Sequence, residues 1–506
     1  MTTAQGESDP CLSPDLRRVF RFSLWRLAFR FEVAPVGNTP KAGGTWASGS
    51  IRGRQTCSKP FNPKEVRSII ELLQQPAVFL NMVSNWPALQ WTAEHLSQML
   101  DGKELTFRIG KRRTDKAPQF ETQCEYIKGT LQEFLVWLHG ENHSSPGLFS
   151  SFPRSEYWAY ADYKYIAMMF EDKAEFFQDV IWADFGFPGR DGRESTLWIG
   201  SEAANTPCHL DSYGYNLVLQ VQGRKRWHLF PPDDTSNLYP TRIPYEESSV
   251  FSSVNVANPD LERFPRFLRV KPHMVTLCPG EVLFVPRHWW HYVESLDPVT
   301  ISINSWIELD DDDEARVGEA LTRTLVCALK TADPCADTAN WLNATEAVIT
   351  SYETNLQYVN LAVQACLDNA KSSPTCAMKR GQSAQTSSAF PKKRKGVSEA
   401  EESVPTGGLN PEEPTAPLTA NSYFGPNLVP VQQESIACEG GRVSHLSENH
   451  PLDHSLEADH GNVDCDSKPA DDDKALISTD ELLNCLVHPD VIHLMTEILL
   501  GRHSHH

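Results

Sequence analysis

The sequence predicts a mainly β domain with flanking helices, and three observations lead to that prediction. Between residues 195 and 310, short runs rich in β-branched and aromatic residues recur, such as "NLVLQVQG" (216–223) and "EVLFVP" (281–286). Proline and glycine separate these runs, and the connections are short. Helical patterning precedes and follows the β-rich part. This organisation is typical of an antiparallel sandwich or barrel, and the number of runs fits closure.

The segment 59–194 is expected to mix helices and strands ahead of the β-rich core at 195–310. Its first helix begins in "NPKEVRSIIELLQQ", where Asn62 is the expected N-cap and Pro63 takes the first helical position. An apolar stripe with helical spacing follows: Val66, Ile69, Ile70 and Leu73. We expect a strand at 76–83, a second helix at 92–100 and a third helix that ends at Gly140.

Beyond the core, a helical extension is expected at 311–370, after the acidic run "ELDDDDEA". Residues 371–474 are rich in Ser, Pro, Glu, Asp, Asn and Gly, so they cannot bury enough apolar surface to offset ordering entropy. We therefore predict a disordered linker there. Helical patterning returns in a short tail at 475–506, where Pro489 separates two helices. The pattern leaves open whether this tail docks on its own domain or on a partner.

The leader, residues 1–58, is predicted to be variable and disordered. Its stretch "RRVFRFSLWRLAFRF" (17–31) is basic and aromatic, which would also suit a membrane-surface helix or a targeting segment. Acidic residues precede it, and transit peptides usually avoid them. The composition therefore favours a variable leader over a targeting signal.

Composition restricts the partners and the compartment. A net charge of −20 argues against a protein that coats nucleic acid through bulk electrostatics. The twelve cysteines form no CxxC pair, as expected in a reducing compartment, so we expect a cytoplasmic protein. The run Pro391–Gly396, "PKKRKG", looks like a nuclear-import signal, although short basic runs also simply solvate linkers. No apolar run approaches the roughly 20 residues that span a bilayer, so we expect no membrane partner.

The stretch "TPCHLDSYG" (206–214) contains the first candidate site residues. In a strand, residues i and i+2 point to the same face, so His209 and Asp211 would lie side by side. On its own this tripeptide is weak evidence, because a buried histidine bonded to an aspartate is an ordinary structural pair. A metal site needs a third ligand from another strand.

The best candidate for that ligand is His291 in "VPRHWWHYVES", where it begins a predicted strand. His288 is the competitor, but it falls in the expected turn. Two neutral imidazoles and one carboxylate bind Fe(II) on one face and leave three positions open for a chelating cosubstrate and dioxygen. The spacing therefore predicts a 2-His-1-carboxylate site at His209, Asp211 and His291.

Two long stretches resemble the JmjC oxygenases: "LWIGSEAANTPCHLDSYGYNLVLQVQGRKRWHLFPP" (197–232) and "PGEVLFVPRHWWHYVESLDPVTISINSW" (279–306). The resemblance covers about 59–309. Within the family, "YWAYADYKYIAMMFED" (157–172) is similar to a branch named for association with a small heat-shock protein. The resemblance implies a double-stranded β-helix, Fe(II) and 2-oxoglutarate as cofactors, and a small heat-shock protein as a partner.

The resemblance also implies cosubstrate residues. Lys225 matches the family position for the distal carboxylate of 2-oxoglutarate, and alternation turns it inward while Arg224 and Arg226 point outward. An inward lysine needs an anion. Four further residues fall on family cosubstrate positions: Thr206, Asn216, Asn304 and, with a looser match, Tyr160.

One departure from the family affects Asn216. The chain has one more residue between Asp211 and Gly223 than the family's asparaginyl hydroxylase, so a bulge or register step could move Asn216. Tyr213 or Tyr215 would then contact the substrate. Three tryptophans are candidates for walls of the pocket, with core filling as the alternative role: Trp289, Trp290 and Trp306.

The functional prediction is an oxygenase that hydroxylates a protein side chain and binds or regulates a small heat-shock protein. The alternative is a non-catalytic JmjC scaffold that binds and inhibits that partner. A third reading is an RNA hydroxylase acting on tRNA, which the acidic charge balance weakens. An intact set of ligands together with an inward lysine favours the enzyme.

Overall fold

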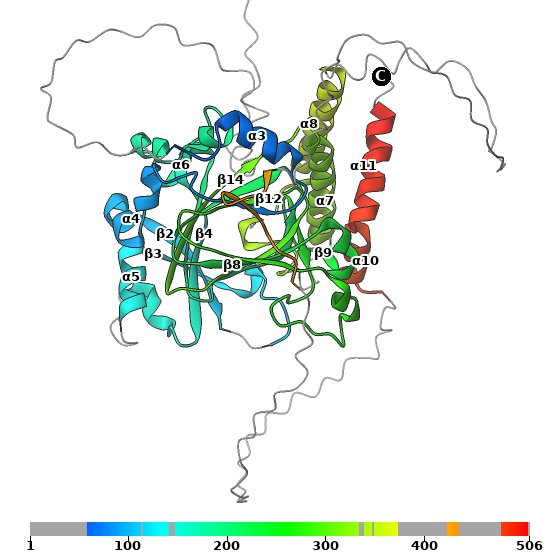
Figure 1. The fold of residues 1–506 in the computed structure, drawn as a ribbon. Coiled ribbons are helices and arrows are strands. Elements are labelled where there is room, and N and C mark those ends of the chain that lie inside the picture. Colours follow the sequence, from blue (N-terminus) through cyan, green and yellow to red (C-terminus); the bar gives the residue numbers. More distant parts are fainter. Residues whose placement is uncertain are drawn as a thin grey trace, which may run out of the picture.

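A computed structural model describes residues 58–112, 115–140, 147–332, 338–346, 349–372, 423–434 and 477–503. The predicted leader, apart from Ser58, and the basic run Pro391–Gly396 lie outside these ranges. Two antiparallel sheets form the centre of the molecule, and helices flank them (Figure 1). The predicted class, mainly β with flanking helices, is confirmed.

The larger sheet has nine strands in the order β15 (Leu428–Pro430), β1 (Ala77–Phe79), β12 (Val282–Val285), β7 (Tyr215–Gln222), β14 (Val299–Ile307), β5 (Thr196–Ser201), β4 (Tyr157–Tyr165), β2 (Glu104–Lys111) and β3 (Glu125–Thr130). The smaller sheet has six strands in the order β11 (His273–Leu277), β8 (Lys225–Phe230), β13 (Trp290–Ser295), β6 (Asn205–Asp211), β10 (Ser249–Ser252) and β9 (Pro240–Glu246). From β5 to β8, and again from β11 to β14, successive strands alternate between the two sheets. This arrangement is the double-stranded β-helix that the resemblance implies.

The inner faces of the two sheets share one apolar cluster. It joins Val218 and Leu283 of the larger sheet to Trp227, Leu229 and Val293 of the smaller one. Each of these side chains points inward because strand residues alternate between faces. The polar residues of the candidate site lie on the same inward faces, so the packed interior positions them.

The three N-terminal helices that the sequence predicts are present. Helix α3 (Pro63–Leu72) starts with a capping box, in which the Asn62 side chain accepts from the Glu65 backbone and the Glu65 side chain accepts from the Asn62 backbone. Such a cap contributes about 1 kcal/mol. Three residues of the predicted stripe, Val66, Ile69 and Ile70, are the buried residues of this helix. Helices α4 (Ala93–Leu100) and α5 (Leu131–His139) lie at the end of the sheet formed by β2 and β3 (Figure 1), and a short helix, α6 (Ile166–Met169), follows β4.

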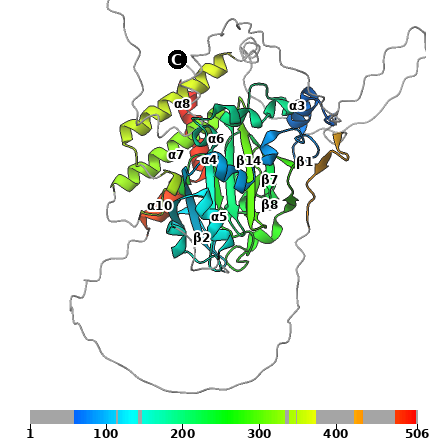
Figure 2. The same ribbon diagram turned by 90° about the vertical axis from the view of Figure 1, so that its left-hand side faces the viewer.

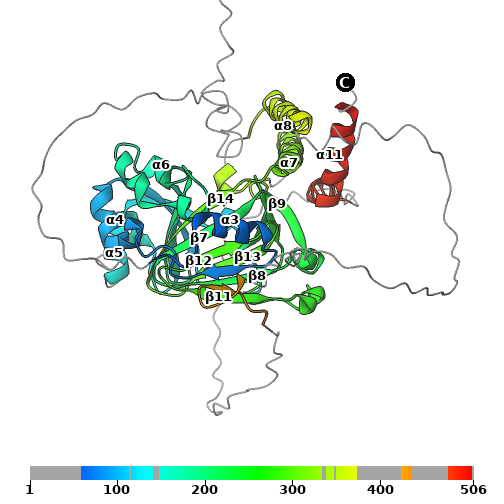
Figure 3. The same cartoon turned by 45° about the horizontal axis from the view of Figure 1, so that its top comes forward.

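The C-terminal helices form a separate layer beside the β-helix. Helices α7 (Asp312–Ala332) and α8 (Tyr352–Ser372) pack together, and the tail helices α10 (Thr479–Leu486) and α11 (Pro489–His503) pack on α7 (Figure 3). Leu483 of α10 is buried with Val326 of α7 and Trp341, whose indole N–H donates to Asp480 at 2.6 Å. Of the two expectations for the tail, docking on its own domain is therefore correct.

None of the described helices is by itself long and apolar enough to cross a membrane. Helices α10 and α11, which are bent by 53° at their junction, meet the length and composition criteria as a pair.

The predicted linker contains an ordered segment, which we call the clasp (residues 423–434). Its strand β15 pairs antiparallel with β1 and forms the edge of the larger sheet, and Figure 2 shows this orange segment beside β1. Its second half reaches the smaller sheet, where Gln432 accepts from the Met274 amide at 3.3 Å. The prediction of disorder throughout 371–474 was wrong here. A short apolar motif, "LVPV" (428–431), was hidden by the polar composition around it.

The clasp supplies two buried side chains to the β-helix. Leu428 is fully buried in the main core, and Val431 packs in the apolar cluster between the sheets. The Asn427 carbonyl accepts from the Leu80 amide at 3.0 Å, which extends the pairing with β1 by one bond. The clasp thus covers the edges of both sheets and removes an exposed template for pairing with other chains.

Because Leu428 is fully buried, we expect its side chain to contribute to the stability of this edge. Leu428→Ala should lower the free energy of unfolding by about 2–4 kcal/mol, because it deletes buried methyl groups and leaves a cavity. Hydrogen exchange at the Leu80 amide should accelerate, since its acceptor lies in the clasp. The matched control is Val429→Ala, at a neighbouring position that is 40% exposed, where the change should stay within about 0.5 kcal/mol. Equal effects of the two substitutions would show that the clasp is not anchored as described.

Candidate metal centre

Strands β6 and β13 bring the three predicted ligands together. His209 and Asp211 lie two residues apart on β6 and share its inner face. Strand β13 pairs antiparallel with β6, and His291 is the direct partner of His209 in that pairing. The register shifts between His291 and Val293, which marks an irregularity next to the ligand. Such irregularities are common beside active sites because they reorient side chains.

The ligand atoms of the three residues lie within 4.8 Å of one another. His209 Nε2 lies 3.7 Å from Asp211 Oδ1, and His291 Nε2 lies 3.9 Å from Asp211 Oδ2. The two imidazole rings are 4.2 Å apart between centroids. Among the described residues this is the cluster of His, Cys, Asp and Glu that could hold a metal ion.

Backbone carbonyls orient both imidazoles. His209 Nδ1 lies 2.9 Å from the Pro207 carbonyl, and His291 Nδ1 lies 3.0 Å from the Trp289 carbonyl. Because a carbonyl oxygen only accepts, Nδ1 carries the proton in each neutral ring, and Nε2 keeps its lone pair. These hydrogen bonds therefore direct the two Nε2 atoms toward Asp211, as they do in histidines that bind metals.

Burial keeps His209 in its neutral form. Desolvation lowers the pKa of His209 to about 4, and the nearby His291 lowers it as well, while Asp211 opposes the shift. A neutral imidazole is the form that binds a metal ion. At neutral pH this ring is ready to coordinate without first losing a proton.

Trp306 of β14 holds the carboxylate of Asp211. Its indole N–H donates to Asp211 Oδ2 at 3.0 Å. The other two tryptophans proposed as walls have different roles. Trp289 packs in the apolar cluster between the sheets and donates to the Gln74 carbonyl. Trp290 packs in a second apolar cluster, on the outer face of the smaller sheet, and donates to Thr235. Core filling, the alternative role, is therefore correct for both.

His288 lies in the turn before β13, with a left-handed backbone (φ 63°), and is not a member of the cluster. The sequence therefore ranked the two histidines of "RHWWH" correctly. Position within the strand distinguishes them, because only a residue inside β13 shares the inner face.

The structure turns Lys225 inward, as strand alternation predicts. Its side chain is 2% exposed, while Arg224 pairs with Asp297 on the outside. Lys225 Nζ donates to Ser302 Oγ at 2.8 Å and to Tyr160 Oη at 3.1 Å. Within the described part of the chain, no carboxylate lies within ion-pair distance of this ammonium group. Burial lowers the pKa of Lys225 to about 7, and the negative charge of Asp162, which lies beyond ion-pair distance, partly opposes this shift.

The other predicted cosubstrate residues are also buried on inner faces. Asn304 Nδ2 donates to Asn216 Oδ1 at 2.9 Å, and Thr206 is buried on β6. Asn216 thus points inward despite the extra residue in its loop. Tyr215 packs against Phe284 in the main core, and Tyr213 donates to Glu247 at 2.6 Å. Neither tyrosine replaces Asn216 on the inner face.

Two residues near the site were missed by sequence reasoning. Ser302 lies two residues before Asn304 on β14, so strand alternation could have placed it beside Lys225. Strand alternation could not have identified Tyr163. It has a left-handed backbone (φ 50°) at an irregularity of β4, and its ring lies 4.6 Å from that of Trp198.

Tyr163 lies in an acidic environment. Burial raises the pKa of Tyr163 well above its ordinary value, and four carboxylates raise it further: Glu246, Glu121, Asp162 and Asp211. Burial also raises the pKa of Glu121 to about 7. Residues in strained backbone conformations are concentrated at functional sites. Tyr163 therefore combines an unusual backbone conformation with several neighbouring carboxylates, of which the candidate ligand Asp211 is one.

Comparison with known proteins agrees with this architecture. A family model described as a Cupin-like domain matches residues 63–313. HSPB1-associated protein 1 homolog of Danio rerio is 50% identical over 468 residues, which cover 88% of this chain and 98% of that protein. The chain belongs to the HSPB1-associated protein 1 family. HSPB1-associated protein 1 of Bos taurus is 51% identical over 494 residues, covering 93% of this chain and all of that protein.

A more distant likeness extends beyond the HSPB1-associated protein 1 family. Lysine-specific demethylase 8 of Xenopus tropicalis is 26% identical over 240 residues, which cover 46% of this chain and 48% of that protein. The resemblance to JmjC proteins that the sequence motifs carry is thereby confirmed.

The environment of Lys225 predicts how pH affects anion binding. We expect 2-oxoglutarate, the cosubstrate that the resemblance implies, to bind most tightly when Lys225 is protonated. Because burial lowers the pKa of this lysine to about 7, raising the pH from 7.5 to 9 should weaken binding roughly 25-fold. Calorimetry with Mn(II) in place of iron would measure this. Lys225→Arg is the control, since a guanidinium stays protonated and should flatten the pH dependence. A pH-independent dissociation constant in the wild type would exclude Lys225 as the anion partner.

Proposed function

We propose that this chain is an Fe(II)- and 2-oxoglutarate-dependent oxygenase that hydroxylates a protein side chain. The observation that carries the proposal is the convergence of His209, Asp211 and His291 on one point between the sheets. The donor set fits iron(II), because two neutral imidazole nitrogens and one carboxylate are the ligands of non-haem iron oxygenases. Bound iron, 2-oxoglutarate and dioxygen would supply the oxidation of a C–H bond to an alcohol.

The residues of this chain would bind and orient the reactants. Lys225 would pair with the distal carboxylate of 2-oxoglutarate, with Ser302 and Tyr160 holding the ammonium group in place. Trp306 would keep Asp211 in a fixed orientation toward the metal. The apolar cluster between the sheets would exclude water from the site.

We also propose that the protein associates with a small heat-shock protein of the HSPB1 type. Relatives that match nearly their whole length carry the name HSPB1-associated protein 1. The tail helix α11 has large apolar side chains on its outer side, with Leu494 55% and Ile498 48% exposed. Clustered exposed apolar residues often mark protein interaction sites. This surface also supports the alternative, a scaffold whose main role is binding.

The ligand assignment predicts a loss of turnover. Asp211→Ala should abolish iron-dependent conversion of 2-oxoglutarate to succinate, measured with cell extract as the source of substrate, because one of three ligands is lost. The fold should persist, since Asp211 ends β6 and lies outside the apolar clusters.

The matched control is His95→Asn, which removes an exposed histidine of helix α4 that lies outside the cluster. It should retain turnover. Succinate production that survives in Asp211→Ala would reject the metal site. A wild type that binds iron and 2-oxoglutarate but turns over nothing would favour the scaffold.

The partner proposal predicts a surface-specific loss of binding. The double substitution Leu494→Asp and Ile498→Asp should reduce capture of HSPB1 at least tenfold in a pull-down with purified proteins, because it places charges in the apolar surface. Met168→Asp, a change at a 65% exposed residue of α6, is the control and should leave capture unchanged. Undiminished capture by the double variant would remove α11 from the interface.

A further inference from the structure

The loop immediately after Asp211 is attached to helix α7, which lies outside the β-helix. Ser212 Oγ donates to Glu319 Oε1 at 3.1 Å, and the Gly214 amide donates to Asp312 Oδ1 at 3.0 Å. Between them, the ring of Tyr213 lies 5.0 Å from the guanidinium of Arg316. Each residue of the loop therefore contacts one side chain of α7.

These three side chains form one face of α7. Asp312, Arg316 and Glu319 recur at the i, i+4 and i+7 positions, which lie along one side of an α-helix. All three are buried, with Asp312 fully inaccessible and Glu319 4% exposed. Tail helix α11 packs elsewhere on α7, where Ile492 lies close to Gly318. Helix α7 thus presents a buried polar face to the loop.

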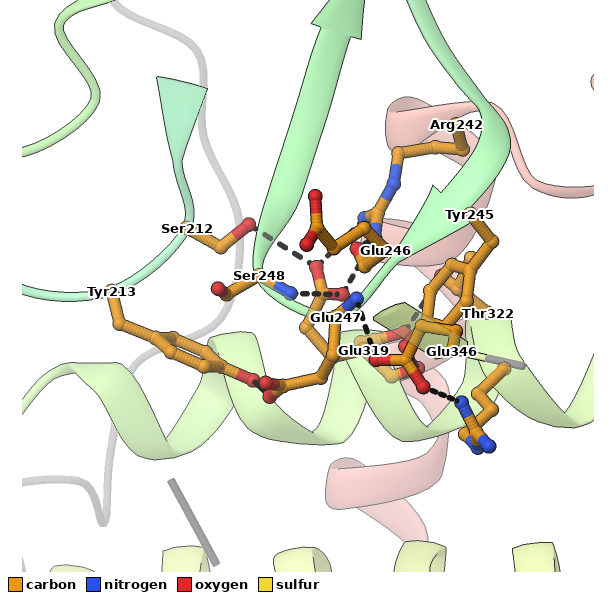
Figure 4. A network of polar contacts seen from close by, with 12 residues as sticks. Ser212, Tyr213, Arg242, Tyr245, Glu246, Glu247, Ser248, Glu319, Thr322 and Glu346 are labelled. Carbon is orange, nitrogen blue, oxygen red and sulfur yellow. Dashed lines mark hydrogen bonds and ion pairs between the residues drawn. The ribbon is translucent and has the colours of Figure 1, made fainter. Parts of the chain in front are cut away.

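Glu319 is the centre of this network, which Figure 4 shows from close by. Its Oε1 accepts from Ser212 and from Arg242 Nη1 at 2.7 Å. Its Oε2 accepts from Arg242 Nη2 at 2.6 Å and from the Ser248 amide at 3.0 Å. A buried carboxylate is stable only when its charge is paired and its lone pairs are used. The four hydrogen bonds satisfy both conditions and leave Glu319 little freedom to move.

The donors to Glu319 surround Asp211 on two sides. Ser212 follows Asp211 in the chain, and Ser249, next to Ser248, pairs directly with Asp211 across the sheet. The Ser212 amide also donates to the Ser248 carbonyl at 2.7 Å, which closes the connection between the two strands. Movement of Glu319 would therefore release both Ser212, which follows Asp211 in the chain, and the strand that pairs with Asp211.

We propose that Glu319 is a positioning residue for the metal centre: it fixes the end of β6 so that the Asp211 carboxylate faces His209 and His291. This inference rests on the proposed function, because it requires a metal bound by these three residues. Trp306 orients the carboxylate from one side, while Glu319 holds the backbone that carries it. Helix α7 thereby contributes to metal affinity although it supplies no ligand.

The test is Mn(II) binding to the full chain, measured by calorimetry at a temperature far below unfolding. Glu319→Gln keeps the shape of the side chain but removes the charge that pairs with Arg242, and we expect about tenfold weaker binding, the lower end of the effect of residues that support metal ligands. The electron paramagnetic resonance spectrum of bound Mn(II) should broaden as the ligand geometry becomes less uniform. A purely structural ion pair would lower the melting temperature and leave affinity and spectrum unchanged.

Two further variants make the outcome decisive. Ser212→Ala removes only the hydroxyl bond to Glu319, so it should weaken Mn(II) binding about threefold with little change in melting temperature, even if Glu319→Gln folds poorly. Glu314→Gln is the matched control, because Glu314 lies on the same helix with its side chain 51% exposed and faces His493 of the tail. It should bind Mn(II) like the wild type.

Unchanged affinity and spectrum in both Glu319→Gln and Ser212→Ala would overturn the inference. The failure of the proposed function looks different. In that case the wild type itself would bind no Mn(II), or would bind it equally well after Asp211→Ala.

Discussion

The antiparallel pairing of β6 with β13 is the constraint on which the candidate metal centre depends. It makes His291 the cross-strand partner of His209, and the two-residue repeat of β6 adds Asp211 on the same face. A slip of one residue in this pairing would turn His291 to the outer face, where Trp290 and Tyr292 now pack. The buried neighbours on each face prevent that slip, since exchanging an imidazole for a tryptophan would break both clusters.

Strand alternation made much of the site predictable. It placed His209 beside Asp211, turned Lys225 inward and ranked His291 above His288. These inferences need only the period of two residues and the turn residues that end each strand, both of which are local. The capping box of α3 is local in the same sense. Properties that depend on neighbours in the sequence could therefore be predicted from the sequence alone.

Several other properties, which depend on distant partners, were not predictable. Glu319 looks like one of many polar residues on a helix, and only the three-dimensional arrangement places it against Arg242 and Ser212. The left-handed backbone of Tyr163 has no signature in a residue that is not glycine. Composition also failed for the clasp, because an average over a hundred residues hides four apolar ones. For Glu319 and for the clasp, the missing information is a partner far away in the chain.

The clasp makes the order of synthesis matter for this fold. Strand β1 is made early, yet its outer neighbour β15 lies near residue 430 of a 506-residue chain. On the ribosome, the edge of the larger sheet therefore remains unpaired while the β-helix, α7 and α8 emerge. Domains generally fold from the N-terminus during translation, and open edges can recruit other nascent chains. The β-helix can therefore pair incorrectly with other chains until strand β15 has been synthesised.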